Sequence, residues 1–414
     1  MVRTDQRQLT PFAGFLRLEI ACLRGVVTAI VVVLLMQTFL VEGLLMRFVV
    51  TSASMSPTLR GPHYVLCCPE CTTVFYVETE DEARSLPNEL PLRRGTCPAC
   101  AFAQVPVPAD TWRNGDRIYV NRAALSLRAV RRWDVVLFRS PEDGKLTIKR
   151  VVGLPGETLE IRDGDIYING QIAVKPLAVQ HTMRIPVQYG RWEMQPRQLS
   201  GTMELAWYPI RNVPHAEPLP IMTTLYGVTN QLCENQWCIE PSGGIFPVRD
   251  LMLEFDWLPE GKKGLRVEAG GIRFEILPPP SSCLKSHACK ITVSLFDRQW
   301  LVAVDDVIII EKPFDETQHS TDKQPFTISL PENDRPSHEE QEASFVRQIT
   351  NLRVWRDVYY TNNQNNASTT SVVIPADCYY LLGDSSNFSS DSRSWKEPFV
   401  TQRNFIGIVG IIQQ

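Results

Sequence analysis

The chain has 414 residues, enough for two or three domains with separate hydrophobic cores, and 44% of its residues are hydrophobic. Its formal net charge of −4 supplies no basic field, which argues against nucleic-acid binding. The 30 prolines against 23 glycines indicate many loops and short strands.

A long apolar stretch, "VVTAIVVVLLMQTFLV", occupies residues 26–41. A helix over residues 25–46 is long enough to cross the hydrocarbon core of a bilayer, which is about 30 Å thick. Basic side chains precede this stretch at Arg3, Arg7, Arg17 and Arg24. The positive-inside rule therefore predicts residues 1–24 in the cytoplasm and the remainder of the chain on the exported side. A cleaved signal peptide remains the alternative, although the apolar run is longer than a signal core.

Two Cys-x2-Cys pairs lie in residues 61–112: Cys68 with Cys71, and Cys97 with Cys100. This spacing is typical of a zinc ribbon, in which four thiolates hold one tetrahedral metal ion. Such a closed shell leaves zinc no position for water or substrate. We therefore expect a structural zinc and no cofactor for catalysis. Two disulfides are the alternative, because thiols oxidise in an exported segment.

Alternating apolar and polar residues predict strands in "GDRIYVNR", "WDVVLFRS", "LTIKRVVG" and "LEIRDGDIYING", all within residues 115–170. Asn169 and Gly170 mark a hairpin turn. The same apolar pattern returns after residue 371 in "CYYLLGD" and "FIGIVGII". We therefore expect one β catalytic domain composed of residues 47–60, 113–175 and 371–414.

Residues 176–370 have a strand rhythm of their own, in "LMLEFDWL", "GIRFEIL", "KITVSLF" and "WLVAVDDVIII". This rhythm predicts a β-sandwich inserted into the catalytic domain. The polar stretches 312–345 and 361–371 are expected to be loops. The sequence does not identify a partner for this insert.

A catalytic serine is indicated in "TSASMSPTLRG", residues 51–61, directly after the apolar stretch. A serine becomes a nucleophile only with a base beside it, and none of the six histidines lies in a serine-hydrolase motif such as G-x-S-x-G. Lys149 lies in an apolar strand, where desolvation would lower its pKa and let it act as the base. A Ser–Lys pair is a known variant of the catalytic triad.

Five segments in this order resemble the sequence boxes of bacterial type I signal peptidase: "SASMSPTL", "GDRIYVNR", "RRWDVVLFRSPEDG", "TIKRVVGLPGETLEI" and "LLGDSSNFSSDSR". The resemblance implies that Ser54 is the nucleophile and Lys149 the general base. It favours Ser54 over its neighbour Ser56. It also implies that Ser52 contributes to the oxyanion hole, that Ser389 orients the lysine amine, and that three charged residues brace the site: Asp384, Asp391 and Arg393.

Two features depart from the family pattern. The loop after Gly383-Asp384 lacks the usual Asn-Arg, and Trp133 stands where the family usually has glycine. Neither departure touches the expected Ser–Lys pair.

The function implied is that of a membrane-bound serine endopeptidase that removes N-terminal signal peptides from exported pre-proteins. Its expected partners are the pre-protein signal peptides and the lipid bilayer. Its expected location is the bacterial cytoplasmic (inner) membrane, as a single-pass protein with its catalytic domain on the periplasmic side. The alternative is a membrane-anchored binding protein built on a degenerate peptidase scaffold.

Overall fold

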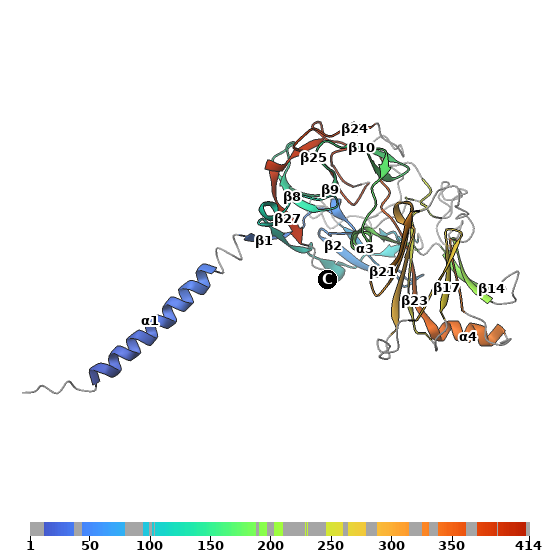
Figure 1. The fold of residues 1–414 in the computed structure, drawn as a ribbon, viewed down its shortest axis with the longest axis horizontal. Coiled ribbons are helices and arrows are strands. Elements are labelled where there is room, and N and C mark those ends of the chain that lie inside the picture. Colours follow the sequence, from blue (N-terminus) through green and yellow to red (C-terminus); the bar gives the residue numbers. More distant parts are fainter. Residues whose placement is uncertain are drawn as a thin grey trace, which may run out of the picture.

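A computed structural model of the protein describes residues 12–36, 44–78, 94–98, 102, 104–187, 190–196, 203–209, 228, 230, 246–259, 264–278, 288–313, 325–330, 338–361, 371–386 and 388–410. Every strand pair in these residues is antiparallel, and the fold is mostly β, as the sequence predicts (Figure 1). The α-helices are α1 (Phe12–Met36), α2 (Ala124–Leu127), α3 (Leu177–Met183) and α4 (His338–Gln348). Short 3-10 turns are η2 (Ala53–Met55), η4 (Ala109–Thr111), η5 (Phe296–Arg298) and η7 (Gln402–Asn404).

A seven-stranded sheet forms the centre of the domain that the sequence predicts to be catalytic, in the order β1-β7-β27-β8-β9-β25-β26. Its strands are β1 (Leu45–Val49), β7 (Arg117–Asn121), β8 (Val135–Arg139), β9 (Leu146–Gly153), β25 (Cys378–Leu382), β26 (Phe399–Thr401) and β27 (Phe405–Gly410). The sheet therefore joins strands from all three predicted pieces of the catalytic domain.

A four-stranded sheet, in the order β12-β11-β10-β24, continues the same domain. It contains β10 (Thr158–Arg162), β11 (Asp165–Ile168), β12 (Gln171–Ile172) and β24 (Val372–Val373). Asn169 and Gly170 join β11 to β12, with φ values of 51° and 82°. These left-handed values suit a two-residue hairpin turn and confirm the turn that the sequence predicts.

Helix α1 covers only the first part of the predicted anchor, because residues 37–43 lie outside the described residues and β1 starts at Leu45. Its side chains from residue 22 to 36 are exposed. In the described part of the chain, no helix meets the length and hydropathy needed to cross a membrane.

The cysteine-rich segment forms two small sheets. One has the order β3-β2-β6 and the other pairs β4 with β5. The strands are β2 (His63–Cys67), β3 (Val74–Glu78), β4 (Arg94–Gly95), β5 (Val105–Pro106) and β6 (Trp112–Arg113). A small cluster of buried side chains, including Leu66, Phe75 and Val77, holds the two sheets together.

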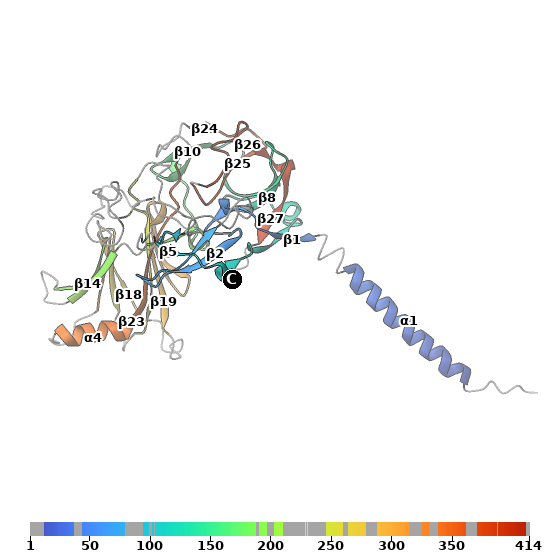
Figure 2. The ribbon, with the colours of Figure 1, turned by 180° about the vertical axis from the view of Figure 1, so that it is seen from behind.

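The insert contains two sheets that share one hydrophobic core, which is the arrangement of a β-sandwich (Figure 2). The first has the order β13-β23-β16-β19-β20-β21, and the second β14-β15-β22-β17-β18. The strands are β13 (Ile185–Val187), β14 (Gly190–Pro196), β15 (Met203–Pro209), β16 (Leu251–Trp257), β17 (Leu265–Ala269), β18 (Ile272–Ile276), β19 (Cys289–Ser294), β20 (Gln299–Val304), β21 (Val307–Pro313), β22 (Phe326–Ser329) and β23 (Ile349–Arg356).

The loop predicted for residues 312–345 is wrong at its start, where β21 extends to Pro313, and in two further places. Strand β22 lies within it and buries Phe326 and Ile328 between the two sheets of the sandwich. Helix α4 begins within it, and Phe345 of this helix packs into the same core. The few apolar side chains of this polar stretch pack into the core of the sandwich, and this packing stabilises both elements. Residues 362–370 of the second predicted loop lie outside the described residues.

Candidate active site

The predicted nucleophile, Ser54, lies on the 3-10 turn η2, which follows β1 after residues 50–52. Met55 and Leu59 hold this turn, because both are buried in a cluster with Val50 and β-sheet side chains. Ser54 is left partly exposed, and its Oγ lies 3.4 Å from Ser52 Oγ. Ser56 is buried instead, and its Oγ has no hydrogen-bond partner among the described residues. Of the two candidate hydroxyls, Ser54 is the accessible one.

The predicted base, Lys149, lies on β9 opposite Val136 of β8. Its side chain is only 2% exposed, although it carries an amine. Lys149 Nζ donates a hydrogen bond of 2.9 Å to Ser389 Oγ. Burial lowers the pKa of Lys149 to about 8, an effect that the nearby Asp391 carboxylate opposes. An appreciable fraction of neutral amine therefore exists near neutral pH.

Gly383 packs between the nucleophile's turn and Ser389. A Cβ atom on Gly383 would overlap both Ser389 Oγ and the carbonyl oxygen of Ser54, so only glycine fits there. The Ser385 N–H also donates a hydrogen bond of 3.2 Å to that carbonyl oxygen. Within the described residues no hydrogen bond joins Ser54 Oγ to Lys149 Nζ, although η2 contacts β9. Gly383 thus lies against both the Ser54 backbone and Ser389, and Ser389 in turn accepts the hydrogen bond from Lys149.

Asp391 and Arg393 form a buried ion pair in the loop that carries Ser389. Arg393 Nε and Nη2 donate to the two carboxylate oxygens of Asp391 over 2.9 and 2.7 Å. Burial alone would raise the pKa of Asp391, but Arg393, together with Lys149 and the Gly383 N–H, lowers the pKa below its usual value. Asp391 also accepts the Gly383 N–H over 3.0 Å. The ionised carboxylate therefore fixes the glycine at the centre of the site.

Asp384 has a partner that sequence reasoning missed. Arg150 Nε and Nη2 donate to its two carboxylate oxygens over 2.7 and 2.6 Å, and both side chains are fully buried. Thr58, four residues after Ser54, also donates to Asp384. The available signal was the adjacent pair Lys149-Arg150 in an apolar strand, since successive side chains of a strand point to opposite faces. Asp384 thus ties the strand of the lysine to the segment of the serine.

Trp133, the residue that departs from the family pattern, has a φ of 73°. Glycine adopts this left-handed region without cost, which is a physical reason for glycine at this position. The Trp133 carbonyl accepts a 2.9 Å hydrogen bond from Arg150 Nη1, and the indole N–H donates to the Val174 carbonyl over 3.2 Å. The Trp133 backbone therefore binds Arg150, while the indole packs beside Val174, just before the insert begins.

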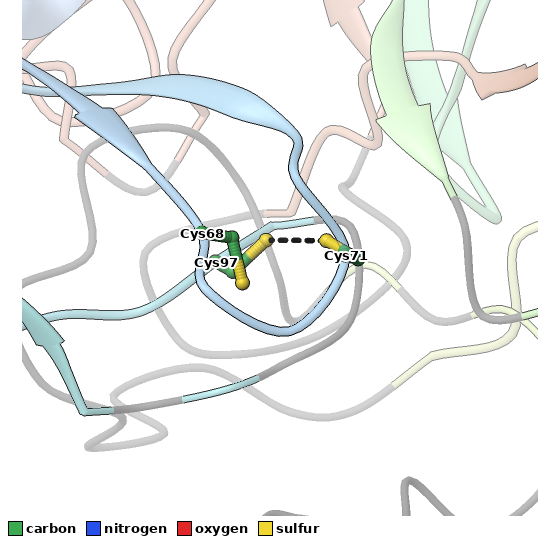
Figure 3. Close-up of side chains that lie close together, drawn as sticks. All are labelled: Cys68, Cys71 and Cys97. Carbon is green, nitrogen blue, oxygen red and sulfur yellow. Dashed lines mark hydrogen bonds between the residues drawn. The ribbon is translucent and has the colours of Figure 1, made fainter.

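Three of the four predicted zinc ligands come together (Figure 3). The sulfur atoms of Cys68, Cys71 and Cys97 all lie within 4.8 Å of one another. Cys71 Sγ and Cys97 Sγ are 3.6 Å apart, much longer than a disulfide bond and close to the roughly 3.8 Å between thiolates on one zinc ion. Cys100 lies outside the described residues. The sulfur donors fit the demands of a structural zinc ion.

Comparison with known proteins places the chain in a family. The sequence profile of the family described as "Signal peptidase, peptidase S26" matches residues 101–215 and 302–413, more than half of the chain. The chain belongs to this family. The matched peptidase S26 segments contain Lys149 and Ser389, whereas Ser54 lies before them.

Individual relatives match over shorter regions. The chain is 41% identical over 66 residues to "Signal peptidase I V" of Bacillus subtilis, which is 16% of this chain and 39% of that protein. It is 32% identical over 95 residues to "Probable signal peptidase I-1" of Synechocystis, covering 20% of this chain and 46% of that protein. The chain thus spans less than half the length of each of these two peptidase S26 relatives.

Proposed function

We propose that the protein is a membrane-bound serine endopeptidase that cleaves N-terminal signal peptides from exported pre-proteins. The observation that carries the proposal is the buried amine of Lys149, held by Ser389 next to the turn of Ser54. Membership of the peptidase S26 family and the printed names of the relatives support the same reaction.

In the proposed mechanism, the neutral amine of Lys149 accepts the Ser54 hydroxyl proton while Ser54 Oγ attacks the carbonyl carbon of the scissile bond. Ser389 Oγ keeps the amine in position through its hydrogen bond. The Ser54 N–H and the Ser52 hydroxyl donate to the oxyanion that forms, and the protonated lysine then supplies the proton that the leaving amine requires. Water hydrolyses the resulting acyl-enzyme by the same route. The ion pair Asp391–Arg393 braces the loop that carries Ser389, and Arg150–Asp384 ties this region to β9, the strand of Lys149.

The proposed location is the bacterial cytoplasmic membrane, with the N-terminus inside and the catalytic domain on the periplasmic side. The apolar run at residues 26–41 and the exposure of the apolar side chains of α1 support a single anchor over residues 25–46. We further propose that Cys68, Cys71, Cys97 and Cys100 hold one structural zinc ion that stabilises residues 61–112. Catalysis needs no cofactor in this scheme.

Cleavage of a labelled pre-protein by the detergent-solubilised full chain tests the proposal. Ser54→Ala and Lys149→Ala should each abolish cleavage, and the double variant should be little worse than either, because the two residues act as one unit. Ser56→Ala and Lys145→Ala are matched controls, since the first hydroxyl is buried without a hydrogen-bond partner among the described residues and the second amine is exposed in the turn between β8 and β9. Wild-type protein that binds the pre-protein without cutting it would favour the degenerate binding scaffold.

A further inference from the structure

A cavity of about 760 Å³ lies beside the candidate active site. Its wall begins with Pro57 and Thr58, three and four residues after Ser54, and continues along the β2–β3 turn, the start of β7, helix α3 and strand β23. The catalytic domain, the cysteine-rich segment and the sandwich therefore each supply part of it. Its volume lies within the roughly 300–1,000 Å³ typical of ligand pockets.

The charge of this cavity is predominantly positive. Four arginines line it, Arg60, Arg117, Arg184 and Arg353, against the single carboxylate of Asp116. His181 adds no charge at neutral pH, because burial and the neighbouring Arg184 lower its pKa to about 4. Positive charge collected in a hollow attracts an anionic ligand more strongly than the same charge on a flat surface.

The four guanidinium groups are not equally available. Arg184 is paired with the buried Glu254 and stacks over the Trp355 ring at 4.2 Å, and Arg60 lies 3.7 Å over the Tyr76 ring. Both are therefore fixed in the wall. Arg117 and Arg353 are exposed, and no ion pair engages either one among the described residues. These two supply the guanidinium forks that best suit carboxylates.

The position of the cavity indicates which part of a substrate reaches it. Strand β1 follows the proposed anchor in sequence and forms one edge of the central sheet, whereas β23 belongs to the sandwich at the opposite end of the body (Figures 1 and 2). A signal peptide whose apolar segment stays in the membrane would approach from the β1 side. The polypeptide after the scissile bond then continues away from the membrane, past Thr58.

We propose that this cavity binds acidic side chains in the mature part of the pre-protein, shortly after the cleaved bond. This proposal rests on the proposed function, because it assigns part of the substrate to a site next to Ser54. Most of its wall comes from the cysteine-rich segment and the insert, which gives both additions a role in substrate choice. The expected occupant is an extended segment with aspartate or glutamate side chains close to Arg117 and Arg353.

Paired substrates test this assignment. Two pre-proteins, identical through the cleaved bond, would carry either three glutamates or three glutamines among the first eight mature residues. Wild-type protein should cut the glutamate substrate with a KM about 5-fold lower, and 0.5 M salt should reduce the difference, because partly exposed ion pairs are modest and screened. In Arg117→Glu/Arg353→Glu the preference should disappear or reverse. Arg266→Glu, an exposed arginine on β17 outside the cavity, should keep it.

A binding measurement separates failure of this proposal from failure of the proposed function. Fluorescence anisotropy of the labelled mature peptide with Ser54→Ala protein needs no cleavage, and the glutamate peptide should again bind more tightly than the glutamine peptide. Arg117→Gln/Arg353→Gln serves as a milder variant and should lose the difference without adding negative charge. Equal binding of the two peptides, or an unchanged preference in both double variants, would overturn the cavity assignment even if signal peptides are cleaved.

Discussion

A lysine can act as a base near neutral pH only if its surroundings make the ammonium less stable than it is in water. Lys149 meets this requirement by burial in β9, and its one direct polar contact in the described structure is the hydroxyl of Ser389. A hydroxyl accepts a hydrogen bond from the amine without adding the negative charge that would stabilise the ammonium. Asp391 lies near enough to oppose the shift, but Arg393 occupies both of its oxygens.

The pH dependence of cleavage follows from this environment. With the pKa of Lys149 lowered to about 8, the amine is mostly protonated below this value and mostly neutral above it. We expect kcat/KM to rise between about pH 6 and 9 with an apparent pKa close to 8. Initial rates on a labelled pre-protein would measure it, with tryptophan fluorescence confirming that the protein stays folded. A rate independent of pH over this range would contradict a lysine base.

From the residues alone, the sequence predicted the lysine of this pair but not the serine that binds it. An amine in an alternating apolar strand indicates burial, so Lys149 could be singled out directly. Ser389 is 240 positions away, and no local spacing links it to the lysine, so only the family resemblance pointed to it. Arg150 was missed because its partner, Asp384, lies just past the end of β25, and strand pairing between β9 and β25 is not encoded in either segment separately.

At the scale of single elements, the bend before β8 combines strain with packing. Trp133 holds a left-handed backbone while its indole is 6% exposed and contacts both Val174 and the Lys175 ammonium. The left-handed conformation costs a non-glycine residue about 1–2 kcal/mol. Removal of a buried tryptophan side chain costs about 3–5 kcal/mol. The packing therefore outweighs the strain.

Substitution of Trp133 separates these two contributions. Trp133→Gly should lower the free energy of unfolding by about 2 kcal/mol, because lost packing exceeds relieved strain. Trp133→Ala loses the same indole but keeps the strained Cβ, so it should be less stable than Trp133→Gly by about 1 kcal/mol. Urea unfolding of both variants would measure the difference. The usual order, with alanine more stable than glycine, would show that the backbone relaxes when the indole is removed.

The cysteine-rich segment illustrates what spacing can predict. Cys-x2-Cys pairs indicated a common site, and turns at Cys68–Thr73 and Cys97–Phe102 do bring the sulfur atoms of Cys68, Cys71 and Cys97 together. The spacing did not reveal that this segment also forms one wall of the arginine-lined cavity, because that depends on how the β2–β3 turn and β3 lie relative to α3 and β23.

Metal removal is the corresponding test. We expect about one zinc ion per chain by elemental analysis of the purified protein. Cys68→Ser/Cys97→Ser should lose the metal and expose residues 61–112 to protease, since the described residues of this small segment have few buried side chains besides the cluster around Phe75. Cleavage activity should fall only partly, because no described residue of this segment hydrogen-bonds to Lys149. Metal-free wild-type protein with its cysteines oxidised would favour the disulfide alternative.

At the scale of the whole molecule, the sandwich is joined to the catalytic domain by a mixed apolar and charged contact. Leu159 and Ile161 of the four-stranded sheet pack with Met183, Ile185 and other side chains near the ends of the insert. Beside them, four carboxylates lie within 4.8 Å of one another, those of Asp165, Asp250, Asp297 and Asp357. Lys175 pairs with two of them, Asp297 and Asp357. Composition could not predict this group, because its members lie far apart along the chain.

The carboxylates at this joint should make the stability of the protein depend on pH. Burial, reinforced by the neighbouring carboxylates, raises the pKa of Asp250 to about 7, and burial raises that of Asp357 to about 6 despite Lys175. In the unfolded chain these groups lose their protons near pH 4. Between about pH 4 and 7 the folded state therefore binds more protons, and the free energy of unfolding falls as pH rises through this window. Above about pH 7 the loss is complete.

Replacement of Asp250 by its neutral isostere tests this linkage. An asparagine side chain is not charged at any pH, and its amide oxygen can still accept the Asp297 N–H, which now donates to Asp250 over 2.9 Å. Asp250→Asn should therefore unfold with a weaker pH dependence and be more stable than wild type at pH 8, by on the order of 3 kcal/mol. Asp163→Asn, at an exposed turn beside the same carboxylates, is the matched control. Urea unfolding at pH 5 and pH 8 would measure both variants. Identical curves for Asp250→Asn and wild type would show that ionisation of Asp250 does not cause the pH dependence.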